Sequence, residues 1–200
     1  MQGPMRSADA PFERIARTAA ELFLAKGYAG VSLREVAAAL GIRAASLYHH
    51  CPAGKAELYR RSLEVFLADY REGLAGSRGR ARFPERLLRM TDWMLEHPPV
   101  DLQHIVRVDL PHLDEAAGLA LNARLHDAVL GPYAETFEEA KRTGAVVPRL
   151  QAGLAAACVV SLVHGLGFAH VGDGEERRAA KRTVRAGVRL LLEGALPSPG

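Results

Sequence analysis

The stretch from Ser32 to Lys55, SLREVAAALGIRAASLYHHCPAGK, constrains the fold more than any other part of the chain. Its first four residues form a capping-box pattern, in which a serine hydroxyl and a glutamate carboxylate accept from free amides at a helix start. Apolar residues recur at helical spacing up to Gly41, which suits the left-handed conformation that ends many helices. A second helix is expected over residues 43–50, before Pro52. Two short helices joined by such a turn predict a helix-turn-helix, whose second helix enters the DNA major groove.

Composition and charge narrow the protein class. The chain has 200 residues, 48% of them hydrophobic, and two cysteines, so a disulfide scaffold is excluded and a reducing, cytoplasmic setting is expected. The sequence predicts no signal peptide and no membrane span. Up to residue 62, nine basic residues stand against five acidic ones, an excess that accounts for more than the whole net charge of +3. A basic first third favours an anionic partner there, although an ordinary solvated surface is the alternative.

The rest of the chain shows helical periodicity without strand alternation, so we predict an all-α fold of about nine helices. An amphipathic helix is expected over residues 12–26, ending at Gly27, and a connector helix from Lys55 to about residue 73. The later helices are expected over residues 84–97, 100–109, 113–143, 150–170 and 175–193. The helix over 113–143 contains Gly131-Pro132, where a kink or an interruption is expected.

The polar, basic segment 77–82 marks the predicted domain boundary. Residues 10–56 are expected to form a three-helix bundle with the helix-turn-helix, and residues 82–195 a larger helical body, which the family resemblance described below would assign to ligand binding and dimerisation. Residues 150–170 are apolar nearly all round and rich in small residues, so this helix must be buried. A homodimer interface formed by the last two long helices, with Val184, Val188, Leu191 and Leu192, would bury it, and burial inside the monomer is the alternative.

Residues 13–58 contain three dispersed motifs: ELF-x-x-KGY, SLREVA-x-x-LGI, and ASLYHH followed by Pro, Gly and Lys55. In order and spacing they resemble the DNA-binding segment of the TetR family of transcriptional regulators. The resemblance implies an all-helical homodimer, a small-molecule pocket in the second domain and repression relieved by a ligand. Two departures stand out. Cys51 takes a position that is commonly aromatic, and Arg43-Ala44 replaces a frequent Ser-Lys, so no relative's operator sequence can be transferred.

Nine residues are predicted to contact DNA. If Leu47 points into the bundle, Ala45 and His49 lie on the opposite face. Arg43 is expected to bind a guanine edge or a phosphate, and Lys55 a phosphate. The full set is Ser32, Arg34, Arg43, Ala44, Ala45, Ser46, Tyr48, His49 and Lys55. Two alternatives stay open: Tyr48 as a half-buried core residue, and a metal held by the consecutive residues 49–51, which diverge by ~100° per residue on a helix.

A ligand pocket is predicted from apolar side chains with a few polar tips in the later helices. The candidates are Met90, Trp93, Met94, His97, His104, Val108, Leu125, Tyr133, Phe137 and His164. Each of them is equally a candidate for ordinary core packing. Because His97, His104 and His112 are spaced by about two helical turns, a metal site or a pH sensor is a further alternative.

Together these features predict a homodimeric repressor that binds a pseudo-palindromic, double-stranded operator and is released by a small, largely apolar effector. No cofactor, metal or membrane partner is expected. An enzyme is the first alternative, but the sequence has no glycine-rich phosphate loop after a strand, no HExxH and no GxSxG. Cys51 lies in the DNA-facing motif and Cys158 in an apolar helix, so neither suggests a nucleophile. A helical interaction protein without sequence-specific DNA binding is the second alternative, and the basic motif argues against it.

Overall fold

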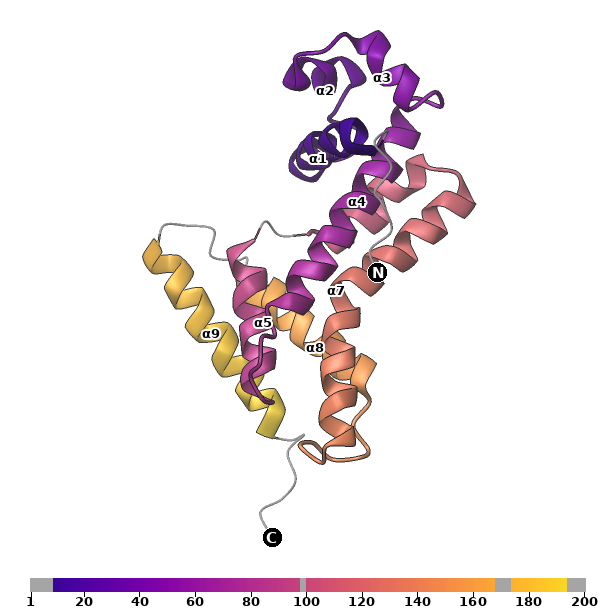
Figure 1. The fold of residues 1–200 in the computed structure, drawn as a ribbon. Helices are drawn as coiled ribbons and strands as arrows, with labels where there is room; N and C mark the ends of the chain where they lie inside the picture. The colour runs from indigo at the N-terminus through magenta and orange to yellow at the C-terminus, as the bar shows by residue number, and fades with distance from the viewer. Residues whose placement is uncertain (1–8, 98–99, 168–173, 194–200) are drawn as a thin grey trace. The chain divides into compact units, whose positions relative to one another are not determined.

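The computed structural model describes residues 9–97, 100–167 and 174–193 (Figure 1). Within these ranges it has nine α-helices, two π-helical turns, one 3₁₀ turn and no strand, which confirms the predicted all-α class. The chain divides into two compact units. The first comprises Met1–Asp69 and Val100–Leu125, and the second Tyr70–Pro99 and His126–Gly200. None of the described helices is both long and apolar enough to cross a membrane.

The first unit holds the three N-terminal helices, with α2 packed against both α1 and α3. Its core includes Phe23 of α1, Val36 of α2 and Leu47 of α3, each at most 2% exposed. A later segment of the chain completes the unit. Its elements are α1 (Asp9–Lys26), α2 (Leu33–Leu40), α3 (Ala44–His50), the first part of α4 (Lys55–Gly76), α6 (Leu102–His104), the π-helical η1 (Ile105–Asp109), the 3₁₀ turn η2 (Leu110–His112) and the start of α7 (Glu115–Arg142).

The Ser32 half of the predicted capping box and the two glycine helix ends are present. The Ser32 hydroxyl accepts a hydrogen bond from the Glu35 amide at 3.2 Å, and Gly27 and Gly41 end α1 and α2 with φ of +70° and +67°. The Glu35 carboxylate also pairs with the Lys26 ammonium, whose hydrogen bond is the main reason that the pKa of Glu35 is lowered. Local sequence signals therefore define both ends of α2.

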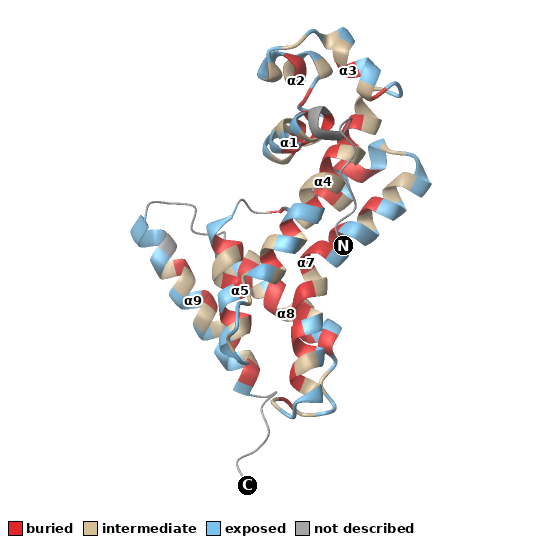
Figure 2. Ribbon diagram, viewed as in Figure 1, coloured by how far each residue is buried: buried red, intermediate tan, exposed pale blue. Residues whose placement is uncertain are grey.

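The second unit packs α5 (Glu85–Glu96) against α9 (Gly174–Glu193) and against the π-helical η3 (Val163–Gly167). α8 (Ala152–Leu162) also contacts α9. The buried positions of these amphipathic helices alternate with exposed ones (Figure 2). Val184, Val188 and Leu192 of α9 are at most 2% exposed within this unit, so their predicted role at a dimer interface is wrong. They are core residues of the monomer, because α9 buries this face on α5 and α8.

Three helices differ wholly or in part from the prediction. The expected helix over 100–109 is a short α6 followed by η1 and η2, and the Asp101 carboxylate caps α6 by accepting from the His104 amide at 2.9 Å. α7 continues through Pro132 without an interruption, and the alternative of a kink there stays a prediction. Pro132 is buried, and its carbonyl accepts from the Thr136 hydroxyl at 2.8 Å. The expected helix over 150–170 becomes π-helical from Val163, and its residues 168–170 lie outside the described part.

The predicted domains, residues 10–56 and 82–195, stay a prediction about which part binds DNA and which binds ligand. By packing, residues 100–125 group with the N-terminal helices. Helices α4 and α7 each contribute residues to both units. The described helices thus bring a late segment of the chain next to the helix-turn-helix.

Candidate nucleic-acid interface

Helix α3 presents the side that was expected to face DNA. Leu47 is its one buried residue, with 1% of its surface exposed. Ala45 and His49 are exposed, as expected for residues about two positions away on the helix. Tyr48 is 53% exposed, so it is not a core residue. The exposed side of α3 is therefore available to a partner.

Four of the nine predicted contacts line one open depression of about 550 Å³ on the first unit. Ser32 and Arg34 border it at the start of α2, Tyr48 in α3 and Lys55 at the start of α4. Three separate helices thus contribute polar groups to one concave surface. Glu35 also lines it and is the acidic member of the set.

The other five predicted contacts lie on α3 or at its N-cap and do not line the depression. Arg43 is the N-cap residue and is exposed, and within the described residues its guanidinium forms no ion pair. Ala45 and His49 are exposed, while Ala44 and Ser46 are partly covered. These residues form a face of α3 that could lie against base edges, whereas the depression offers groups suited to a phosphate backbone.

The Lys55 ammonium is held at the edge of the depression by an aromatic ring. Its Nζ lies 4.3 Å from the centroid of the Tyr28 ring, a cation–π distance. The Tyr28 ring meets Tyr59 edge-on at 5.1 Å and stacks on His112 at 4.8 Å. Partial burial raises the pKa of the Tyr28 hydroxyl. Lys55 is consequently a positioned cation rather than a freely moving surface lysine.

Glu57 modifies the expected anion site at the start of α4. Its carboxylate accepts from the Ala53 amide, in the turn just before α4, at 2.9 Å, so an acidic group lies beside this helix start. A negative charge here opposes an anion at the helix N-terminus, and a phosphate contact by Lys55 stays a prediction.

The end of α3 is fixed by Arg61, a residue outside the predicted set of DNA contacts. Its guanidinium donates to the His50 carbonyl and stacks over the Phe12 ring at 3.6 Å. Cys51 is 1% exposed beside it, and burial raises the pKa of the Cys51 thiol. Of the described residues, no group of three or more His, Cys, Asp or Glu side chains is placed to hold a metal ion, at residues 49–51 or elsewhere. Cys51 is thus a packing residue.

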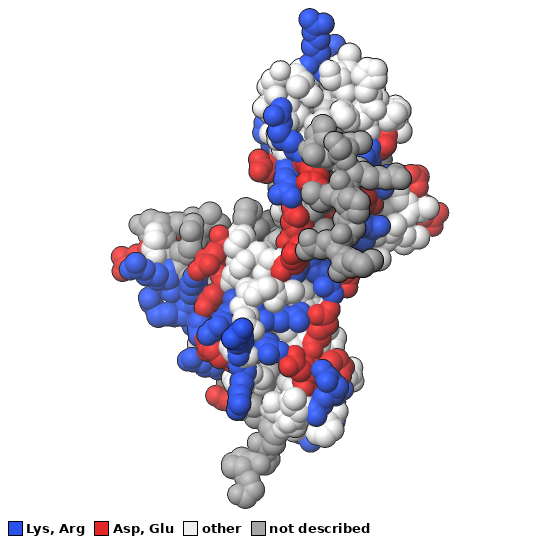
Figure 3. All heavy atoms as spheres, viewed as in Figure 1, with Lys and Arg blue, Asp and Glu red and all other residues white. Residues whose placement is uncertain are grey.

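Basic charge is not confined to the helix-turn-helix. Figure 3 shows Lys and Arg side chains gathered over α9 of the second unit. Arg185 of this helix pairs with Asp92, and Lys181 pairs with Glu96. The excess of charge in the first third of the sequence is therefore weaker support for a DNA site than the geometry of α2, α3 and α4.

The ten predicted ligand-binding residues are divided between the two units. His104, Val108 and Leu125 belong to the first unit, and the other seven belong to the second. Val108 is 46% exposed, and His97 is exposed. His97 and His104 also fall in different units, so the described structure gives no support to a three-histidine sensor with His112.

Within the second unit, four of these residues fill the core. Met90, Met94, Tyr133 and Phe137 are at most 1% exposed. The Tyr133 hydroxyl lies 3.2 Å from the Met94 sulfur, and burial raises its pKa well above the ordinary value. Trp93 stacks on His97 with ring centroids 3.8 Å apart. The His164 ring Nδ1 lies 2.8 Å from the Val160 carbonyl oxygen. A role of these residues in ligand binding stays a prediction.

A cavity of about 420 Å³ in the second unit was not predicted. It is largely apolar, and only Phe137 of the expected set reaches it. Arg149 and Gln151 add polar groups to its wall. The signal in the sequence was the run of apolar residues after residue 149, which was assigned to the dimer interface. The other lining residues are Val147, Leu150, Leu154, Ala155, Cys158, Leu191 and Leu192.

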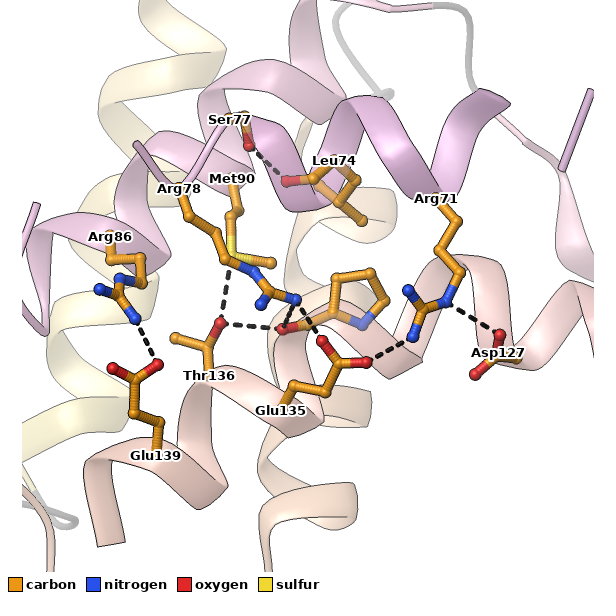
Figure 4. Close-up of polar contacts among 11 residues, drawn as sticks. Arg71, Leu74, Ser77, Arg78, Arg86, Met90, Asp127, Glu135, Thr136 and Glu139 are labelled. Atoms are coloured by element: carbon orange, nitrogen blue, oxygen red, sulfur yellow. Dashed lines mark hydrogen bonds and ion pairs between the residues drawn. The ribbon is translucent and has the colours of Figure 1, made fainter. Parts of the chain in front are cut away.

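An arginine–carboxylate network joins parts of the second unit (Figure 4). Glu135 of α7 accepts from both Arg71 and Arg78, and Arg71 also donates to Asp127 at 2.9 Å. Arg86 of α5 pairs with Glu139. The hydrogen bond from Arg78 is the main cause of the lowered pKa of Glu135. These ion pairs connect α7 to neighbouring segments of the second unit, and none of their residues lines the depression.

Comparisons with known proteins agree with this geometry. Residues 15–61 match the model of the family described as bacterial regulatory proteins, tetR family. A putative TetR-family transcriptional regulator from Mesorhizobium loti MAFF303099 superposes with a TM-score of 0.74 at 19% identity, over 97% of this chain and 100% of that one. The structure of NemR from E. coli, in its reduced form, superposes with a TM-score of 0.72 at 15% identity, over 94% of this chain and 98% of that one. PfmR, a TetR family transcriptional regulator from Thermus thermophilus, superposes with a TM-score of 0.58 at 25% identity, over 90% of this chain and 98% of that one. No curated protein sequence matches the chain.

Proposed function

Since the chain belongs to the TetR family of transcriptional regulators, with the family's DNA-binding domain at residues 15–61, we propose that it is a homodimeric repressor. It binds a pseudo-palindromic operator and leaves it when a small, largely apolar effector binds. Family membership makes the chain a DNA-binding regulator and not an enzyme. We propose that it acts in the cytoplasm, where bacterial operator DNA lies.

One observation carries the proposal: the depression between α2, α3 and α4 adjoins helix α3, whose outer side is exposed. Ser32, Arg34, Tyr48 and Lys55 offer hydrogen-bond donors to one phosphate backbone from the depression. Arg43, at the N-cap of α3, offers a planar guanidinium that can bind a guanine edge through two hydrogen bonds. Backbone contacts position the unit on the duplex, and the α3 contacts select its sequence.

A homodimer supplies the second half-site contact, because one α3 spans only a few base pairs. Two large apolar residues support an interface formed by α8 and α9: Leu154 is 61% exposed and Leu190 is 70% exposed. Gly153 and Ser161 of α8 and Gly165 of η3 are exposed small residues, which would allow a second helix to pack closely. Exposed leucines next to small residues are the pattern of a helix–helix interface between subunits.

The cavity of about 420 Å³ in the second unit supports an apolar effector, because small-molecule sites are typically of this size and mainly apolar. The test is a titration of small apolar compounds into the protein–duplex complex, with the fluorescence of a bound apolar dye and duplex release followed together. A compound that releases DNA should change both signals. If no releasing compound also changes the dye fluorescence, this assignment fails.

The decisive experiment is selection from a random duplex pool followed by sequencing. The proposal predicts that retained duplexes share two inverted half-sites one helical turn, or a multiple of it, apart, about 34–36 Å between centres. Sedimentation at micromolar protein concentration should give a dimer, and a Leu190→Glu variant should shift toward monomer. Retention of no common sequence would contradict operator binding, and a monomeric wild type would contradict the dimer.

A further inference from the structure

A buried carboxylate lies at the centre of a polar cluster in the first unit. Asp109, the last residue of η1, is 2% exposed. Its Oδ1 accepts from the Tyr28 amide at 2.8 Å, and its Oδ2 accepts from the Tyr59 hydroxyl at 3.0 Å. His104 Nε2 lies 3.5 Å from Oδ1. A buried carboxylate is costly unless donors surround it, so these contacts form one interdependent set.

The cluster joins three segments that are far apart in the chain. Tyr28 lies in the turn between α1 and α2, Tyr59 in α4 and Asp109 in η1. Gly27 makes the close approach possible, since a Cβ there would lie 2.9 Å from His104 Nε2 and 3.4 Å from Asp109 Oδ1. Burial, and secondarily the charge of Asp109, raises the pKa of Tyr59, so this hydroxyl stays a donor at neutral pH. Asp109 therefore fixes the α1–α2 turn on α4.

The ring of Tyr28, whose backbone amide Asp109 binds, also contacts the Lys55 ammonium. Asp109 holds the Tyr28 backbone, Tyr59 and His112 pack against the Tyr28 ring, and Lys55 Nζ lies 4.3 Å from its centroid. We propose that Asp109 is a positioning residue for DNA binding, which acts through Tyr28 to hold Lys55 at the edge of the depression. This inference rests on the proposed function, in which Lys55 binds a phosphate.

The proposal predicts that removing the charge of Asp109 changes the DNA affinity in the direction opposite to the one that charge alone would cause. Asp109 carries a negative charge in a DNA-binding unit, so its removal would by itself strengthen the attraction of phosphates. If Asp109 positions Lys55, its removal weakens binding instead, because an unheld lysine must lose side-chain entropy when it reaches a phosphate. The sign of the change separates the two effects.

The test compares Asp109→Asn with Asp114→Asn, using the duplex that the wild type retains from a random pool. Asp114 is exposed and caps α7 by accepting from the Ala117 amide at 2.9 Å, and asparagine keeps that acceptor. We expect Asp109→Asn to weaken binding by about threefold to tenfold, and Asp114→Asn to leave it unchanged or slightly tighter. Unchanged or tighter binding by Asp109→Asn would overturn the proposal.

A double-mutant cycle with Lys55→Ala separates positioning from general damage to the fold. In the Lys55→Ala background, Asp109→Asn should cost less than about twofold, since the group it positions is gone. An equal loss in both backgrounds would mean that Asp109 only stabilises the fold. If Lys55→Ala itself binds as the wild type does, the phosphate assignment of the proposed function fails instead.

A DNA-free measurement keeps the positioning step testable in every case. In Asp109→Asn, the Tyr28 amide should exchange hydrogen faster, and the Lys55 amine should be acetylated faster by a small reagent, relative to Asp114→Asn. Melting curves establish that each variant is folded. If Asp109→Asn does not fold, Tyr59→Phe, which removes one donor and keeps the ring, should change both rates in the same direction. Rates equal to those of the wild type would refute the positioning role.

Discussion

The guanidinium carbon of Arg61 lies 3.6 Å from the centroid of the Phe12 ring. The same guanidinium donates to the His50 carbonyl at the end of α3. One side chain of α4 thus ties α1 to the C-terminal end of α3. Because α3 buries only Leu47, this contact supplies a substantial part of what holds the helix in place.

Arg61→Ala should therefore lower the free energy of unfolding by about 1–3 kcal/mol, through the lost cation–π contact and the unpaired His50 carbonyl. Urea denaturation measures this loss. Arg60→Ala is the matched control, since Arg60 makes only an i,i+4 pair with Glu64 and should cost about 0.5 kcal/mol or less. Equal losses in the two variants would show that the Phe12 contact contributes nothing.

Gly73→Ala should destabilise the second unit although alanine favours a helix. A Cβ at Gly73 would lie 2.5 Å from Cζ2 of Trp93, whose ring is held between Tyr70 and His97. Overpacking of this kind costs about 1–3 kcal/mol, more than the gain of about 1 kcal/mol in helix propensity. A lower melting temperature and altered Trp93 emission are expected. Gly76→Ala, with no neighbouring atom within 4 Å of its Cβ, should not be destabilising.

Glu135 should make stability depend on pH in the acidic range. Hydrogen bonds from Arg78 and Arg71 lower its pKa in the folded state below the ordinary value of 4.5. Glu135 therefore stabilises the folded state at pH values above its pKa in the unfolded chain. This contribution to the free energy of unfolding is lost as the pH falls through its pKa in the folded state. The difference in unfolding free energy between the wild type and Glu135→Gln should shrink from about pH 6 to about pH 3. Urea denaturation across this pH range measures the difference. The control is Glu138→Gln, which removes an exposed ion pair with Lys141 and should alter the free energy of unfolding less than Glu135→Gln does.

Lys55→Ala and Arg43→Ala should weaken DNA binding in different ways. Loss of a phosphate contact at Lys55 should weaken all duplexes similarly and reduce the salt dependence, the slope of log K against log salt, by about one. Arg43→Ala should also change which duplexes are retained, because a base contact is lost. Repeated selection and salt titrations measure both. Arg189 is an exposed cation of α9, so Arg189→Ala is the control. An equal loss of binding in that variant would mean that Lys55 acts only through its general charge and not through a specific phosphate contact.

The helix-turn-helix could be predicted from the sequence because its signals are local. The Ser32 cap, the left-handed Gly41 and the apolar spacing around Leu47 all act within a few residues of the chain. Each of them is present as expected. The contact of these residues with DNA stays a prediction.

The Asp109 cluster could not be predicted, because its contacts span 81 residues to Tyr28 and 50 to Tyr59. In the sequence Asp109 is an ordinary acidic residue before Leu110-Pro111. The role of the expected ligand residues could not be decided from the sequence either. An apolar stripe such as Met90 and Met94 has the same spacing whether it lines a cavity or fills a core.

The single buried residue of α3 has a consequence for how this regulator changes over evolution. Leu47 is the one buried residue of α3, and Ala44, Ser46 and His50 are only partly covered, so the other residues of α3 carry less folding constraint than Leu47. Operator preference can then be rewritten, by mutation or by design, without first compensating for lost stability. A library that varies residues 44–46 and 48–49 around a fixed Leu47 should yield mostly folded proteins with new target sequences.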